Sequence, residues 1–208
     1  MKLLGGIIMY SSPAEFAKEK MNNIELQGND EIVCMNARAF IESTYKYKYV
    51  NHFSWLGMPV MQFPQDLMAM QEIIYNVKPD CIIETGVGRG GSIVFYASML
   101  HLLGINGKVI GIDFSIDKNN LTIIQEHSMF RYIKLIQGNS LEDNTIKSVR
   151  DFIDKKQYKK IMVLLDSSHE YSHVLSEMIK YSNFVSNGSY LVVFWTLIED
   201  LPESFCHS

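Results

Sequence analysis

The chain has 208 residues, of which 47% are hydrophobic and 20% are charged, and its formal net charge is −4. This length favours a single domain that can bury a substantial core. The sequence has neither a basic excess nor a basic stripe, which argues against binding to nucleic acid or to an anionic membrane.

The cysteines and the N-terminus indicate the compartment. Cys34, Cys81 and Cys206 are far apart and have no metal-like spacing, which fits a reducing environment better than a disulfide scaffold. Residues 1–14 carry one lysine and a short apolar run that two glycines interrupt, so they make a poor signal peptide and are too short to span a bilayer. We therefore expect a cytoplasmic protein without a transmembrane segment.

The first sixty residues predict mainly helices. Two serines before Pro13 favour the start of one helix, and Asp30 favours the start of another that runs towards Tyr45. Residues 53–59 indicate an irregular aromatic loop. A third helix is expected to begin at Pro64 and to end at Lys78-Pro79. We expect residues 1–63 to be a helical extension packed on the core of a domain that spans residues 64–208.

From residue 80 onward, segments of strand and helix character alternate. Strands are predicted at 81–85, 108–113, 131–137, 160–166 and 189–196, and helices at 91–103, 118–127, 143–155 and 169–185. Continuous apolar strands such as 161–165 indicate a parallel sheet that is covered on both faces. The sequence therefore predicts a doubly wound, Rossmann-like α/β fold with a mostly parallel sheet.

A glycine-rich turn follows the first of these strands. Residues 80–92 read DCIIETGVGRGGS, and Gly86, Gly88 and Gly91 match the spacing of the dinucleotide fingerprint. Such glycines let backbone amides approach a ligand closely. Glu84 stands just before the turn, where a carboxylate would repel a pyrophosphate. The pattern therefore favours S-adenosylmethionine, which has no phosphates, over a nicotinamide dinucleotide.

Polar residues also end the next three strands. Asp113 can accept hydrogen bonds from both ribose hydroxyls, a role that we prefer to that of a helix cap. Ser140 borders the adenine or caps the next helix. Asp166 could ligate a metal or orient a base, and His169 could accept a proton from a substrate hydroxyl or bond to the backbone at a helix start. Residues 169–173 also match the zinc motif H-E-x-x-H, which we treat as fortuitous because it lies at a strand–helix junction; we expect His173 to face solvent or to pack at an edge.

A set of short motifs extends from about residue 55 to residue 202. They are Trp55-x-Gly57-x-Pro59, Pro64-x-Asp66, Lys78-Pro79-Asp80, Glu84-Thr85-Gly86-Val87, Gly90-Gly91-Ser92, Ile112-Asp113, Gly138-x-Ser140, Asp166-Ser167-x-His169, His173-Val174 and Gly188-Ser189-Tyr190. In this combination the chain resembles the cephalosporin hydroxylase-like and rhamnosyl O-methyltransferase family.

The resemblance implies a class I S-adenosylmethionine-dependent O-methyltransferase. Its acceptor would be a hydroxyl of a small molecule, a sugar or a glycolipid, in lipid or polysaccharide biosynthesis, and the protein would be a homo-oligomer. Asp166 and His169 would be the catalytic residues. The cofactor would be bound by Glu84, Gly86, Gly88, Gly91, Ser92, Asp113 and Ser140.

The chain departs from the family pattern on the acceptor side and at its C-terminus. Relatives can bind a divalent cation such as Mg²⁺ through the aspartate after the fourth strand and acids after the fifth. Here Trp195 stands where an aspartate is common, so Asp166 lacks its partner acid, and Asn139 also replaces a common aspartate. A sheet of this class continues with two further strands, which residues 201–208 cannot supply, so we expect C-terminal strands to be missing and the fifth strand to be an exposed edge.

Two alternatives stay open at this point. One is a catalytically impaired remnant of the family that binds cofactor or assembles with an intact paralogue. The weaker one is an NAD(P)-dependent reductase, because the glycine spacing alone would also suit that cofactor.

Overall fold

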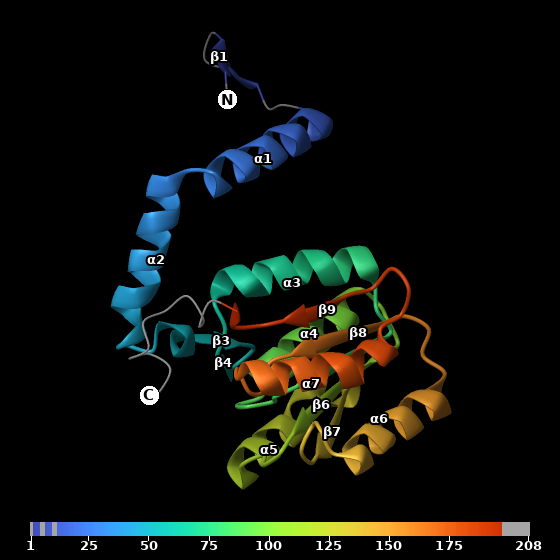
Figure 1. The fold of residues 1–208 in the computed structure, drawn as a ribbon. Helices are drawn as coiled ribbons and strands as arrows, with labels where there is room; N and C mark the ends of the chain where they lie inside the picture. The colour runs from blue at the N-terminus through green and yellow to red at the C-terminus, as the bar shows by residue number, and fades with distance from the viewer. Residues whose placement is uncertain (1, 5–6, 10–11, 197–208) are drawn as a thin grey trace. The chain divides into compact units, whose positions relative to one another are not determined.

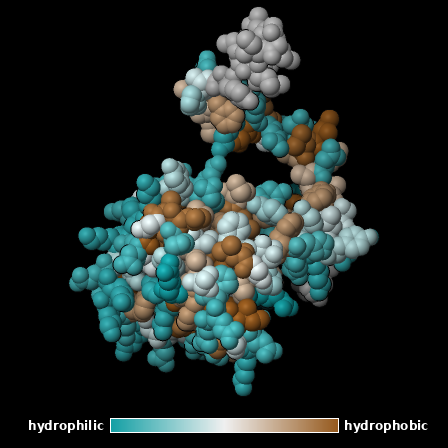
Figure 2. Space-filling model, turned by 180° about the vertical axis from the view of Figure 1, so that it is seen from behind, coloured by the Kyte–Doolittle hydropathy of each residue, from teal (hydrophilic) through white to brown (hydrophobic). Residues whose placement is uncertain are grey.

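The computed structural model describes residues 2–4, 7–9 and 12–196 (Figure 1). The chain divides into two compact units, Met1–Tyr49 and Val50–Ser208. In the first unit, β1 (Lys2–Leu4) pairs antiparallel with β2 (Ile7–Met9), and α1 (Pro13–Gly28) and α2 (Glu31–Tyr45) follow. None of the described residues in these two helices is buried. Figure 2 shows hydrophobic side chains among hydrophilic ones on one face of the molecule.

Local capping explains where α1 and α2 begin. The Ser12 hydroxyl accepts a hydrogen bond from the amide of Glu15, whose carboxylate accepts one from the amide of Ser12, so the two form a capping box. The Asp30 carboxylate accepts hydrogen bonds from the amides of Ile32 and Val33. Both predicted helix starts are confirmed.

The second unit opens with a β-hairpin, where the sequence predicted an irregular loop. After the 3₁₀ turn η1 (Tyr49–His52), β3 (Phe53–Trp55) pairs antiparallel with β4 (Met58–Val60). The two residues of the turn, Leu56 and Gly57, both have positive φ, at 48° and 85°. This is the geometry that closes a two-residue hairpin, but a leucine in it is uncommon. The loop prediction for residues 53–59 was therefore wrong.

The core of the second unit is a five-stranded parallel sheet with the strand order β7-β6-β5-β8-β9. The predicted mostly parallel, doubly wound fold is confirmed. The strands, in chain order, are β5 (Cys81–Thr85), β6 (Lys108–Asp113), β7 (Ile133–Gln137), β8 (Ile161–Leu165) and β9 (Leu191–Val193).

Helices cover both faces of this sheet, and each face has its own cluster of buried apolar residues. Along β5, for example, Ile82 joins one cluster and Ile83 the other, as the alternation of side chains along a strand requires. The helices are α3 (Pro64–Val77), α4 (Gly91–Leu102), α5 (Lys118–Glu126), α6 (Asp143–Lys156) and α7 (Tyr171–Tyr181), with 3₁₀ turns η2 (Ser128–Tyr132) and η3 (Ser182–Phe184).

Three predicted element boundaries change. The strand predicted at 131–137 begins only after η2, the strand predicted at 189–196 is limited to β9, and the helix predicted at 169–185 is α7 followed by η3. The prediction for residues 201–208 lies outside the described residues. No described helix is both long enough and apolar enough to cross a bilayer.

Candidate functional site

A cavity of about 380 Å³ lies at the carboxyl ends of the central strands. The strand order reverses direction between β5 and β8, and ligands bind at such a switch point in open α/β sheets. The lining comes from the end of β6, from the loops after β5, β6, β7 and β8, and from α7. Its residues are Gly86, Gly88, Ile112, Asp113, Phe114, Gly138, Asn139, Ser140, Asp166, Ser167, Ser168 and His173.

Gly86 is required by the backbone geometry of this loop. Its φ is +86°, and a Cβ atom there would lie 2.0 Å from the backbone oxygen of Asp166. Any side chain at this position would therefore separate the loop after β5 from the loop after β8. The close approach brings two walls of the cavity together.

Asp113 holds the same glycine loop from the end of β6. Its Oδ2 atom accepts hydrogen bonds from the amides of Val87, at 2.9 Å, and Gly88, at 3.1 Å, while Oδ1 accepts one from the amide of Ser115. A carboxylate oxygen has more than one lone pair, so these contacts leave acceptor capacity on the side that lines the cavity. The residue predicted to bind the ribose also fixes the loop that would carry the cofactor.

Glu84 lies behind the cavity rather than in its lining. It is fully buried, and the Ser92 hydroxyl donates to its Oε2 at 3.0 Å, while Oε1 has no partner among the residues that the structure describes. Burial raises the pKa of Glu84 well above its ordinary value; the charge of Asp166 adds to the rise, the Ser92 hydrogen bond opposes it, and the charge of Asp113 adds to it. A buried carboxylate with a free oxygen is suited to a cationic or hydrogen-bond-donating partner.

Gly91 and Ser92 also lie outside the lining of the cavity. A Cβ atom on Gly91 would lie 2.1 Å from the carbonyl oxygen of Pro59, so this glycine lets α4 begin close to the β3–β4 hairpin. Ser92 contacts the site through its hydrogen bond to Glu84.

Of the nine residues predicted from the sequence, five line the cavity: Gly86, Gly88, Asp113, Ser140 and Asp166.

Asp166 lines the cavity at the end of β8 and is tied to the chain before α3. Buried Gln62 donates from Nε2 to Asp166 Oδ2 at 3.0 Å and also lies 3.5 Å from the hydroxyl of Tyr96. Burial raises the pKa of Asp166 to about 7. The Gln62 hydrogen bond opposes this rise, the charge of Asp66 adds to it, and the side chain of Trp195 opposes it as a hydrogen-bonding neighbour.

His169 does not line the large cavity. Its ring centroid lies 5.6 Å from that of Trp195, whose ring lies 6.0 Å from that of Phe63. Partial desolvation lowers the pKa of His169, and the charge of Glu177 opposes the shift. Phe63 and Trp195 also line a smaller cavity of about 180 Å³ between α3 and the end of β9. Of the two residues predicted to be catalytic, only Asp166 lines the large cavity, and both have Trp195 as a neighbour.

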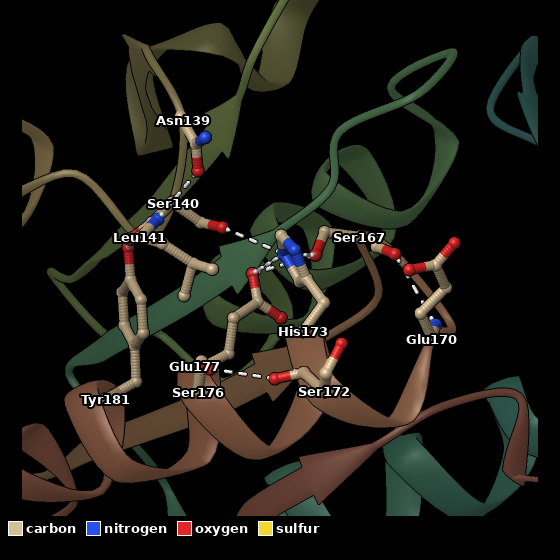
Figure 3. Close-up of polar contacts among 11 residues, drawn as sticks. Asn139, Ser140, Leu141, Ser167, Glu170, Ser172, His173, Ser176, Glu177 and Tyr181 are labelled. Carbon is tan, nitrogen blue, oxygen red and sulfur yellow. Dashed lines mark hydrogen bonds and ion pairs between the residues drawn. The ribbon is translucent and has the colours of Figure 1, made fainter.

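His173 also lines the cavity, although the sequence analysis did not predict it as a site residue. Its Nε2 atom lies 3.4 Å from the Ser140 hydroxyl, 3.3 Å from the Ser167 hydroxyl and 3.4 Å from Glu177 Oε1 (Figure 3). Glu177 is fully buried on α7 and accepts a hydrogen bond from Ser167 at 2.8 Å. The expectation that His173 faces solvent or packs at an edge was wrong.

One sequence signal could have located this network. His173 and Glu177 are four residues apart, so they lie on one helix face, and an acid on the buried face of a helix needs partners. The sequence could not identify Gln62 as part of the site, because its contact with Asp166 joins residues that are 104 positions apart.

The donor groups beside Asp166 do not suit a divalent metal. Mg²⁺ prefers an octahedron of oxygen ligands, and the groups that hydrogen-bond to Asp166 here are nitrogen donors, the side-chain amide of Gln62 and the indole of Trp195. Across the described parts of the chain, no three His, Cys, Asp or Glu side chains form a group that could hold a metal ion.

The sequence profile described as Rhamnosyl O-methyltransferase/CmcI matches residues 47–208. The chain belongs to this family. It is similar to the rhamnosyl O-methyltransferase of Mycobacterium leprae (strain TN), with 29% identity over 157 residues that cover 73% of this chain and 66% of that protein. The rhamnosyl O-methyltransferase of Mycobacterium tuberculosis (strain ATCC 25618 / H37Rv) is 28% identical over 159 residues, which cover 74% of this chain and 63% of that protein.

Solved structures of the Rhamnosyl O-methyltransferase/CmcI family have the same fold. An apo structure of CmcI matches with a TM-score of 0.53 and 19% identity, over 74% of this chain and 63% of that one. A structure of CmcI with Mg and SAM matches with a TM-score of 0.50 and 17% identity, over 75% of this chain and 64% of that one. The chain spans just under two thirds of the length of the two mycobacterial relatives.

Proposed function

We propose that the chain binds S-adenosylmethionine in the 380 Å³ cavity and transfers its methyl group to a hydroxyl of a sugar. The observation that carries this proposal is the charge of the site. Asp113 and Asp166 are among the lining residues, no lysine or arginine is, and buried Glu84 lies directly behind with a free oxygen.

Such a site suits a cation better than a phosphate. S-adenosylmethionine carries a sulfonium and an ammonium group, both of which carboxylates attract, whereas a dinucleotide carries a pyrophosphate, which they repel. Burial raises the pKa values of Glu84 and Asp166, and Glu84 Oε1 has no partner among the described residues, so a bound cation would stabilise the charged forms of both carboxyls. Membership in the Rhamnosyl O-methyltransferase/CmcI family and the names of the mycobacterial relatives support the same choice.

Each wall of the cavity has a distinct role in this proposal. The Gly86–Gly88 turn lets the backbone approach the ligand, Asp113 accepts from the ribose hydroxyls, and Ser140 borders the adenine ring beside Asn139. Bound S-adenosylmethionine supplies an activated methyl group. Asp166 accepts the proton of the acceptor hydroxyl.

Titration calorimetry on the purified chain tests the proposal. We expect S-adenosylmethionine and S-adenosylhomocysteine to bind, NADH not to bind, and Asp113→Asn to weaken S-adenosylmethionine by about tenfold or more, because hydrogen bonds to a charged group contribute about 1.5–3 kcal/mol. Asp117→Asn is the matched control, since Asp117 caps α5 through the amides of Asn119 and Asn120. Binding of NADH without S-adenosylmethionine would favour the reductase instead.

A specific observation keeps the second function in view. Trp195, together with the lack of a group of three potential metal-binding side chains among the described residues, would also fit a family member that binds the cofactor without turnover. Incubation of the purified chain with a rhamnoside and tritiated S-adenosylmethionine distinguishes the two functions. Labelled product supports methyl transfer, and saturable cofactor binding without product supports a remnant that binds the cofactor without turnover.

We also propose a homo-oligomer in the cytoplasm that serves lipid or polysaccharide biosynthesis. Exposed apolar residues on α7 support self-association, and free Cys34 and Cys81 fit a reducing compartment.

The division between an extension at 1–63 and a domain at 64–208 stays a prediction. The family match from residue 47 and the compact unit from residue 50 favour a shorter extension.

A further inference from the structure

Trp195 has an unusual backbone conformation at the carboxyl end of β9. Its φ is +62°, in the left-handed region that large side chains rarely adopt. Such a conformation persists only where the surrounding structure fixes it, and it recurs at ligand-binding sites. Here the ring centroids of Phe63 and His169 lie 6.0 and 5.6 Å from that of the Trp195 indole.

The position of Trp195 relative to Asp166 connects this aromatic group to the proposed site of chemistry. Asp166 lines the large cavity, and the Trp195 side chain is one of its hydrogen-bonding neighbours. Trp195 also lines the smaller cavity, together with Phe63 and half-buried Asp66. An acceptor that reaches Asp166 from the side away from the glycine loop would therefore meet the indole.

The chemistry of this group suits one face of a sugar. A pyranose ring carries C–H bonds on one face that pack against an aromatic ring, while its hydroxyls need polar partners at the rim. A cavity of about 180 Å³ is smaller than the roughly 300–1,000 Å³ of sites for drug-sized ligands, which limits it to a single small ring. A hydroxyl bound through a cation would instead need several oxygen ligands, and within the described part of the chain no three His, Cys, Asp or Glu side chains form a group that could hold such a cation.

We propose that Trp195, flanked by Phe63 and His169, is an acceptor-binding residue that packs against the apolar face of a single sugar ring, and that the acceptor binds without a divalent cation. The inference rests on the proposed function, because it places the acceptor hydroxyl next to Asp166 and the cofactor cavity. A rhamnoside serves as the test ring, because the mycobacterial relatives are named rhamnosyl O-methyltransferases.

Calorimetry on the full chain saturated with S-adenosylhomocysteine tests the inference, with methyl α-L-rhamnopyranoside as the probe. We expect the same rhamnoside affinity in EDTA and in excess MgCl₂, and no saturable heat when MgCl₂ alone is added. Trp195→Ala should weaken the rhamnoside by about tenfold, and Trp195→Phe should restore most of that loss. In both variants the affinity for S-adenosylhomocysteine should stay within about twofold, which also shows that they fold.

Tyr190→Ala is the matched control, because Tyr190 is an exposed aromatic residue at the opposite end of β9. It should leave rhamnoside binding unchanged. The inference is overturned if the rhamnoside does not bind the saturated wild-type chain, if EDTA abolishes its binding, or if Trp195→Ala leaves its affinity unchanged. A wild-type chain that fails to bind S-adenosylhomocysteine would contradict the proposed function instead.

Discussion

At the scale of single residues, the site is governed by carboxylates that have no cationic partner in the cavity lining. Asp166 combines burial with the nearby charges of Asp66 and Glu177, and its pKa rises from 3.8 to about 7. A group whose pKa is higher in the folded state binds its proton more tightly there than in the unfolded chain. The favourable contribution of that proton to stability is present in full below about pH 3.8 and is lost as the pH rises through about 7.

Asp166→Asn should therefore change how stability depends on pH. Between pH 5 and pH 8, the free energy of unfolding should fall less in the variant than in the wild type, because asparagine cannot ionise. Urea unfolding at several pH values measures the difference, with Asp154→Asn on α6 as a matched control. Parallel curves for wild type and Asp166→Asn would show that the pKa of Asp166 is not raised.

A comparison of Gly86 with Gly104 separates the strain of a positive φ from the effect of the close approach between two loops. Gly86 and Gly104 both have positive φ, but a Cβ atom on Gly104 would meet nothing within 4 Å, whereas one on Gly86 would meet the backbone of Asp166. Gly104→Ala should cost about 1–2 kcal/mol of stability, the strain of the left-handed region alone. Gly86→Ala should cost more and should also abolish cofactor binding, as thermal unfolding and calorimetry can measure. Equal losses of stability would contradict the close approach of the two loops.

At the scale of elements, the strands could be predicted from the sequence and α7 only in part. Buried strands such as β5 and β8 are continuous apolar runs, which identify a covered parallel sheet. On α7 the apolar residues do not mark the buried face, because Glu177 and Tyr181 are buried while Leu175 and Met178 are exposed. Hydrophobic periodicity cannot show that a glutamate is buried when its partners come from loops elsewhere in the chain.

The Glu177 network should therefore stabilise α7 against the sheet. Glu177→Ala removes the acceptor of Ser167 and the neighbour of His173, and it should lower the free energy of unfolding by about 1–3 kcal/mol. Glu177→Gln keeps an acceptor oxygen and should lose less. Exposed Glu170, at the start of the same helix, gives a control that should be neutral as Glu170→Ala. Denaturant unfolding of the three variants tests the order, and a neutral Glu177→Ala would exclude a stabilising role.

At the scale of the whole molecule, five of the nine predicted site residues line one cavity, and the chain divides after Tyr49 rather than after residue 63. The glycine turn, Asp113 and Asp166 were found from the sequence because each follows a strand, and parallel strands bring their carboxyl ends to one edge. Gln62 and the β3–β4 hairpin come from far earlier in the chain and could not be placed by any local pattern. Long-range contacts of this kind depend on the complete fold.

The exposed face of α7 gives a prediction about assembly. Tyr171, Leu175, Met178 and Ile179 recur at helical spacing, and between 40% and 72% of each remains exposed. Contiguous apolar surface of this kind marks interaction sites. Light scattering after gel filtration should give more than one copy of the chain per particle. Leu175→Glu combined with Ile179→Glu should reduce the mass towards that of a monomer, because burying two carboxylates at an interface is strongly unfavourable.

Met68→Glu on α3 is the control for this prediction, since Met68 is also an exposed apolar residue, at 63%, but lies on a different helix. It should leave the mass unchanged. A wild-type chain that is monomeric at all concentrations would contradict self-association, and an oligomer that survives both α7 substitutions would place the interface on another surface. Because the cavity lies at the ends of strands within one copy, the dissociated double variant should still bind S-adenosylhomocysteine.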